Sequence, residues 1–147
     1  LILALAYCIN TITKSMGAAD FLLGVCESWM TPALFLSVAF IAGAVISFFT
    51  GSSWGTFAIC IPIAVPMAYS FTGGQLGTLV YAAVGAVVSG GLFGDHCSPV
   101  SDTTVLSSLG AACDHIDHVR TQLPYALLAA AVSIILWIVV AMVGGAA

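Results

Sequence analysis

The chain has 147 residues, of which 61% are hydrophobic and only 5% are charged, with a formal net charge of −4 at pH 7. A soluble domain usually carries about a quarter charged residues, so we expect most of this surface to face lipid rather than water. The basic residues, Lys14 and Arg120, form no patch that could hold phosphates, which excludes a nucleic-acid partner.

The first thirty residues are expected to lie at the membrane but not to cross it. Residues 1–12 are apolar and too short to span a bilayer, so we expect them to end a helix that begins upstream. In 17–30, Asp20 and Glu27 stand seven apart on one helical face, which suits a short interfacial helix. We therefore expect residues 1–147 to be part of a longer protein.

The segment 32–71 holds no charged residue over roughly forty positions, about twice the length that one crossing needs. It must turn back, and the polar turn around Gly51 can end one helix and cap the next. We predict a helical hairpin whose returning arm is kinked by Pro62 and Pro66. Two spanning helices joined by a polar loop in water fit the length equally well. The predicted tip carries four hydroxyl side chains: Thr50, Ser52, Ser53 and Thr56.

A broken helix is predicted over 77–112. Each of its halves is short for a full crossing, so we expect the two halves to share one crossing. Pro99 cannot continue a helix but suits the first position of a new one. This would place Ser98 at the N-cap of the second half and Asp102 in its first turn.

The last transmembrane helix is predicted over 120–144, because this region contains a charge-free run of about twenty residues. The polar segment 113–122 before that run is expected to reach water. Lys14 and Arg120 are then expected on opposite faces of the membrane, so the positive-inside rule does not fix the orientation. Together these elements predict an all-α polytopic membrane protein.

The interruption concentrates polar residues in the stretch GDHCSPVSDTT, residues 94–104. A helix N-terminus favours an anion, so Asp102 should stay ionised and anchor a cation. Asp95 follows the end of the preceding half-helix, where the partial charge is negative, and should accept a proton more readily. Neighbouring hydroxyls can supply hard oxygen ligands, as at the interrupted helices of many secondary transporters. These hydroxyls belong to Ser98, Ser101, Thr103 and Thr104.

Three other interpretations are open. The polar stretch fits a water-exposed loop followed by an interfacial helix, since an aspartate at the bilayer centre costs about 2.5–3.5 kcal/mol. His96, His115 and His118 with an acid would suit a membrane-embedded zinc hydrolase, but their spacing matches no structural zinc pattern and we expect no zinc site. A helical assembly module is the third, although packing alone does not require charges at the break.

At TGSSWGT and GDHCSPVSDTT the sequence resembles the NhaC-type Na⁺/H⁺ antiporters, within the wider ion transporter superfamily. Gly94–His96, Ser98–Pro99 and Ser101–Thr104 match the pattern of that family, and LSSLGAACDHIDHVRTQLPYA is similar to it as well. The resemblance covers nearly all of this chain but only the C-terminal part of a family member. It implies one repeat of an inverted-repeat transporter, with a helical hairpin, a broken transmembrane helix and a terminal transmembrane helix.

The resemblance also implies a function: a secondary active transporter, not an enzyme, that exchanges Na⁺ for H⁺ as a multi-pass protein of the cell inner (plasma) membrane. Asp95 would alternate between a proton and Na⁺, and Asp102 would be the fixed anion beside it. Further oxygen ligands would come from Ser98, Thr103 and Thr104 and from the tip residues Thr50, Ser52, Ser53 and Thr56. The nearest alternative keeps the fold and exchanges organic acids such as malate and lactate, coupled to Na⁺ or H⁺. Anion recognition usually recruits Arg or Lys, and none stands near the break, which favours bare cation exchange.

No cofactor is expected beyond the transported ions. The expected partners are the lipid bilayer, Na⁺ and H⁺, and the missing N-terminal repeat of the same protein. A homodimer is compatible with the sequence.

Overall fold

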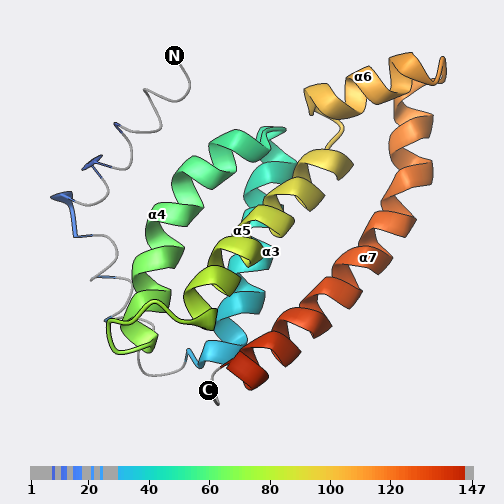
Figure 1. Cartoon of the computed structure of the whole chain (residues 1–147). Coiled ribbons are helices and arrows are strands. Elements are labelled where there is room, and N and C mark those ends of the chain that lie inside the picture. Colours follow the sequence, from blue (N-terminus) through green and yellow to red (C-terminus); the bar gives the residue numbers. More distant parts are fainter. Residues whose placement is uncertain are drawn as a thin grey trace.

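The computed structural model describes residues 30–144 continuously, together with residues 8, 11, 12, 15–17, 21 and 24. The predictions for 1–12 and 17–30 lie largely outside the described residues. The continuous part forms helices α3 to α7 and holds no strand. Figure 1 shows α3, α4, α5 and α7 packed side by side, with the shorter α6 across one end.

Two antiparallel helices form a hairpin (Figure 1). Helix α3, Pro32–Thr50, ends at Gly51, whose φ of 65° is the left-handed conformation that glycine adopts without strain. Ser52 then caps helix α4, Ser53–Phe71, by accepting a hydrogen bond from the Gly55 amide at 3.4 Å. Both predicted kink residues, Pro62 and Pro66, lie inside α4, which stays helical through them.

Helix α5, Thr78–Cys97, and helix α6, Asp102–Gly110, are separated by a break at residues 98–101. The prediction that Ser98 caps the second half was wrong. Pro99 does not begin a helix but belongs to a turn in which the Ser101 amide donates to the Ser98 carbonyl at 3.4 Å. Ser101 is the N-cap instead, and its hydroxyl accepts from the Thr103 amide. Asp102 lies in the first turn of α6, as predicted.

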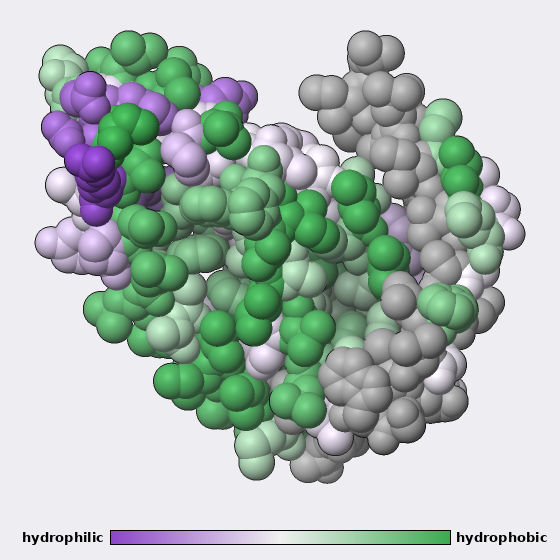
Figure 2. Space-filling model, turned by 180° about the vertical axis from the view of Figure 1, so that it is seen from behind, coloured by the Kyte–Doolittle hydropathy of each residue, from purple (hydrophilic) through white to green (hydrophobic). Residues whose placement is uncertain are grey.

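Helix α7, His115–Gly144, begins five residues before the predicted start. Asp114 explains the earlier start, because its carboxylate accepts from the amides of Ile116 at 2.9 Å and Asp117 at 3.2 Å. Residues 115–122 of the polar segment therefore form the first turns of α7. Figure 2 shows hydrophilic residues gathered at one end of the molecule and a largely hydrophobic face below them.

Within the described residues, three helices are long and apolar enough to cross a membrane: Ser53–Phe71, Thr78–Cys97 and His115–Val143. Helix α3 is also apolar throughout. The chain is thus an all-α polytopic membrane protein, as the composition predicts. Helix α5 has 20 residues, or about 30 Å, which is the thickness of a hydrocarbon core. We had expected α5 and α6 to share one crossing because each is short. The length of α5 alone does not require this.

Helices α3 and α5 meet backbone to backbone. A Cβ atom at Gly90 would overlap the Phe40 carbonyl, and one at Gly94 would overlap the Ala44 carbonyl. In the reverse direction, a Cβ at Gly43 would stand 3.0 Å from the Val87 carbonyl oxygen. Small residues at four-residue spacing allow this close approach between membrane helices. The contact places the last turn of α5 beside the end of α3.

We expect Gly90→Ala to destabilise the full-length protein. Alanine favours a helix interior by about 1 kcal/mol over glycine, but the new methyl group meets a carbonyl that cannot rotate away, and overpacking costs about 1–3 kcal/mol. Gly55→Ala is the matched control, since the nearest atom to a Cβ there is 3.8 Å away. Thermal unfolding in detergent should show a lower midpoint for Gly90→Ala only. Equal midpoints would contradict the close α3–α5 contact.

Candidate functional site

The hairpin tip (residues 50–56) docks against the break between α5 and α6. A Cβ at Gly51 would lie 2.8 Å from the Val100 carbonyl oxygen and 3.1 Å from the Ser101 amide nitrogen, so only glycine fits there. Ser98 is fully buried, and its hydroxyl donates to the Phe48 carbonyl at 2.6 Å. The two polar stretches singled out in the sequence therefore meet in space (Figure 1).

Asp95 lies at the centre of this junction, in the last turn of α5. Its side chain is only 7% exposed. One carboxylate oxygen, Oδ2, accepts from the Ser53 hydroxyl at 3.1 Å, and the other, Oδ1, accepts from the Ser101 hydroxyl at 2.6 Å. Among the described residues Asp95 forms no ion pair. The junction thus contains a buried carboxylate with two hydroxyl donors and no positive side chain against it.

Further hydroxyls extend the network on the α6 side. The Thr104 hydroxyl is buried and lies 3.3 Å from the Asp95 carbonyl oxygen and 3.1 Å from that of His96. The Thr103 hydroxyl lies 2.7 Å from Ser101 Oγ, and either oxygen can be the donor. These contacts satisfy carbonyls at the open C-terminal end of α5, which have no partner within the helix.

The structure divides the predicted site residues into two groups. Ser53, Ser98, Thr103 and Thr104 join Asp95 and Ser101 at the junction. The other predicted hydroxyls make bonds within their own helices: Thr50 to the Ile46 carbonyl, Ser52 to the Gly55 amide and Thr56 to the Ser52 carbonyl. Asp102 is exposed, and within the described part of the chain no hydrogen bond joins its carboxylate to the Asp95 network.

Ser47 is a residue that the sequence analysis missed. It is fully buried in α3, and its hydroxyl has no hydrogen-bond partner among the described residues. It packs against Gly94, where a Cβ would lie 2.8 Å from the Ser47 Cβ. The available signal was its position four residues before Gly51, on the helical face that reaches the tip. Among the described residues, Ser47 therefore brings a buried hydroxyl without a partner to the α3–α5 contact.

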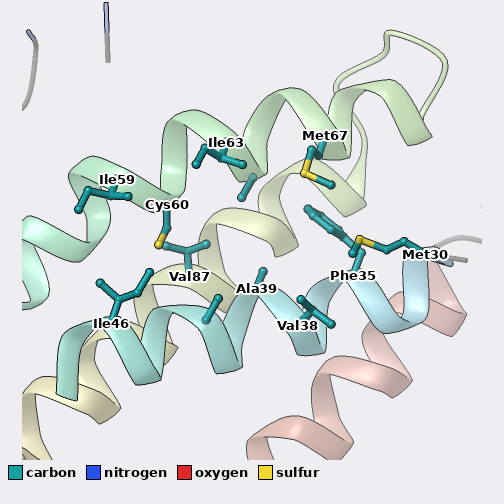
Figure 3. A pocket seen from close by; sticks show the side chains of 12 residues that line it. Met30, Phe35, Val38, Ala39, Ile46, Ile59, Cys60, Ile63, Met67 and Val87 are labelled. Carbon is teal, nitrogen blue, oxygen red and sulfur yellow. The ribbon is translucent and has the colours of Figure 1, made fainter. Parts of the chain in front are cut away.

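Two of the cavities lined by described residues lie outside the junction. One of about 370 Å³ separates the hairpin arms, and Figure 3 shows Met67 of α4 beside Phe35 of α3 at one end of it and Cys60 of α4 near Val87 toward the other. Its lining is apolar, so it offers a cation no ligands. The other, of about 280 Å³, lies between α5 and α7 and includes His96, which is exposed. No three His, Cys, Asp or Glu side chains within the described residues are grouped so that they could hold a metal ion.

A helical membrane protein with a hairpin tip docked on an interrupted helix, and a buried carboxylate where they meet, has the features of a secondary transporter. The chain matches the model of the Na⁺/H⁺ antiporter family over residues 1–142. It belongs to this family, as its two polar motifs indicate.

The curated relatives of this chain include antiporters that are named for different transported species. The chain is 48% identical over 140 residues to an uncharacterized protein of Haemophilus influenzae, covering 95% of this chain and 26% of that protein. It is 36% identical to the malate-2H⁺/Na⁺-lactate antiporter of Bacillus subtilis (78% of this chain, 23% of that one). It is 31% identical to the Na⁺/H⁺ antiporter NhaC of Alkalihalophilus pseudofirmus (95% and 29%). The chain thus spans about a quarter of the length of these curated relatives. No solved structure matches it.

We expect the two buried serines of the junction to respond oppositely to removal of their hydroxyls. Ser98→Ala breaks a 2.6 Å bond and leaves the Phe48 carbonyl without its donor, which should lower the thermal midpoint of the full-length protein. Ser47→Ala removes a buried polar group that has no partner, so the midpoint should stay level or rise. Thermal unfolding in Na⁺-free detergent solution measures both. An equal loss in the two variants would show that Ser47 already has a partner.

Proposed function

We propose that this chain forms the cation-binding part of a Na⁺/H⁺ exchanger in the cell inner membrane, in which Asp95 binds Na⁺ and H⁺ in turn. The observation that carries the proposal is the buried Asp95 carboxylate, which accepts two hydroxyl hydrogen bonds and forms no ion pair among the described residues. Membership of the antiporter family supports the same function.

The coupling follows from the cost of burying a charge. An ionised carboxylate in a low-dielectric site is unstable unless a cation or a proton neutralises it. Among the described residues no basic side chain does this, and in the proposed exchanger a bound ion does it instead. Na⁺ and H⁺ would occupy the same two carboxylate oxygens, and binding of one excludes the other. Competition for one buried group is sufficient to couple the two ions in exchange.

The hydroxyl network can serve both forms of the carboxyl group. When Asp95 is ionised, Ser101 donates to it and can accept from the Thr103 hydroxyl. When Asp95 is protonated on Oδ1, the same bonds can reverse, with Asp95 donating to Ser101 and Ser101 donating to Thr103. When Na⁺ is bound, rotation of the Ser53 and Ser101 hydroxyls presents oxygen lone pairs, which hard cations prefer.

Asp102 has a different role in this proposal. It lies in the first turn of α6, and it is exposed rather than buried. We assign it as the fixed anion that draws Na⁺ toward the junction. The bilayer and the upstream part of the same protein would complete the pathway, and a homodimer remains compatible with the proposal.

A second candidate function is exchange of organic acids coupled to Na⁺ or H⁺. The relative named as a malate-2H⁺/Na⁺-lactate antiporter favours it. The Asp95 junction would then bind the coupling cation, and residues upstream would recognise the organic anion. Counterflow of labelled malate or lactate into proteoliposomes separates the two candidates, since a bare cation exchanger moves neither.

We expect Asp95→Asn to abolish ΔpH-coupled Na⁺ exchange in the full-length protein, because the amide mimics a permanently protonated acid. Asp102→Asn should chiefly weaken Na⁺ binding, and Asp102→Glu should partly restore it. Everted vesicles with a pH-sensitive dye report exchange when NaCl is added. Wild-type exchange by Asp95→Asn across the working pH range would refute the assignment of Asp95 as carrier.

We expect Ser53→Ala to raise the KM for Na⁺ by roughly tenfold, since a hydrogen bond or ligand to a charged group contributes about 1.5–3 kcal/mol. Ser70→Ala is the matched control in the same helix, because the Ser70 hydroxyl binds only the Pro66 carbonyl of its own helix. Initial rates of dye dequenching across a range of NaCl concentrations measure the KM. If Ser53→Ala and Ser70→Ala give the same value, the tip does not contribute to the Na⁺ site.

A further inference from the structure

Helix α7 holds the break through a histidine. His115 Nε2 lies 2.7 Å from the carbonyl oxygen of Pro99, and its Nδ1 lies 3.3 Å from the Ser108 hydroxyl of α6. A carbonyl oxygen can only accept, so Nε2 carries the proton in this contact. One half-buried side chain of α7 therefore joins the break and α6.

A second side chain of α7 holds the end of α5. The Gln122 amide nitrogen donates to the His96 carbonyl at 3.0 Å. Gln122 follows His115 by seven residues, or about two helical turns, so both side chains lie on one face of α7. Both bind backbone carbonyls that the interruption of the helix leaves without a helical partner.

The Pro99 carbonyl held by His115 lies between the two serines whose hydroxyls make the contacts of the break. Ser98 donates to the Phe48 carbonyl at the end of α3, and Ser101 donates to Asp95. Pro99 lies between them, so a displacement of its carbonyl moves one or both serines. The hydroxyl of Ser101 is held 2.6 Å from the carboxylate only while this turn keeps its shape.

We propose that His115 is a positioning residue for the cation site: by holding the Pro99 carbonyl, it fixes the turn that presents Ser101 to Asp95. This inference rests on the proposed Na⁺ exchange at Asp95. Gln122 supports the same function at the His96 carbonyl. Neither side chain touches the bound ion.

The role requires a donor and not a titrating group. Glutamine places an amide N–H at nearly the same reach as Nε2, so His115→Gln keeps the bond to Pro99, whereas His115→Leu fills similar space without a donor. His118 supplies a matched control on the same helix. It is half-buried as well, and its side chain makes no hydrogen bond or ion pair within the described part of the chain.

The first test measures Na⁺ dependence of exchange in everted vesicles for the full-length protein. We expect His115→Leu to raise the KM for Na⁺ about fivefold to tenfold with a smaller change in maximal rate, since a lost hydrogen bond of about 1 kcal/mol changes an equilibrium roughly fivefold. His115→Gln should stay within about twofold of wild type, and His118→Leu should match wild type. An unchanged KM in His115→Leu, or no rescue by glutamine, overturns the positioning role.

The second test does not depend on transport. Amide hydrogen exchange of the segment 98–104 should be faster in His115→Leu than in wild type, and unchanged in His118→Leu, in Na⁺-free detergent solution. Equal rates of amide hydrogen exchange at 98–104 in all three proteins overturn the inference, whatever the transport measurements show. If the wild-type protein shows no Na⁺-dependent proton transport in vesicles, the proposed function fails. Amide hydrogen exchange of residues 98–104 still decides whether His115 holds the break.

Discussion

A carboxylate buried with no positive partner among the described residues is the constraint on which the rest of this structure depends. Asp95 is 7% exposed, and its two oxygens are served by hydroxyls alone. A lysine or arginine beside the Asp95 carboxylate would stabilise its negative charge permanently, and no bound ion would be needed to neutralise it. Hydroxyls stabilise the ionised form only in part, and they can also accept from the protonated form. The site is therefore suited to gain and lose a cation.

The position of this carboxylate depends on close backbone contacts between α3 and α5 and between the hairpin tip and the break. Gly90 and Gly94 let α5 lie directly on the carbonyls of α3, and Gly51 lets the hairpin tip meet the break. Each contact replaces side-chain packing by backbone proximity. Together these contacts set the position of the last turn of α5 relative to the hairpin. The geometry of the junction therefore depends on glycines, which have no side chain to keep the backbones apart.

Much of this could be predicted from the sequence, because the signals are local. The charge-free length of 32–71 required a turn, and Pro99 required an interruption. The details that failed depend on tertiary contacts. Ser98 has the residue type of an N-cap, but its hydroxyl is taken by the Phe48 carbonyl of another helix, and Ser101 caps α6 instead. Ser47 lies in an apolar run, and only its packing against Gly94 distinguishes it from an ordinary helix serine.

The candidate site shows the same division between local and tertiary signals. Asp95 and Asp102 were assigned from the helix ends near them, and that argument treats each carboxylate as an isolated charge on a dipole. The structure adds burial, which the sequence does not show: Asp95 is enclosed by α4 and α6, whereas Asp102 faces outward from the first turn. Two acids seven residues apart can therefore have different partners, although both lie in one short polar stretch.

The break is held from two sides, and this arrangement bears on how the two ions could gain access in turn. Ser98 binds the hairpin through the Phe48 carbonyl, and His115 of α7 contacts the next residue, Pro99. Asp95 bridges the same two bodies through Ser53 on the hairpin and Ser101 beside α6. Any movement of the hairpin relative to α7 must therefore stretch a contact of the carboxylate itself. In an exchanger that uses Asp95, occupancy of the site and the relative position of the two bodies are then coupled by the same hydrogen bonds, and no longer-range relay is required.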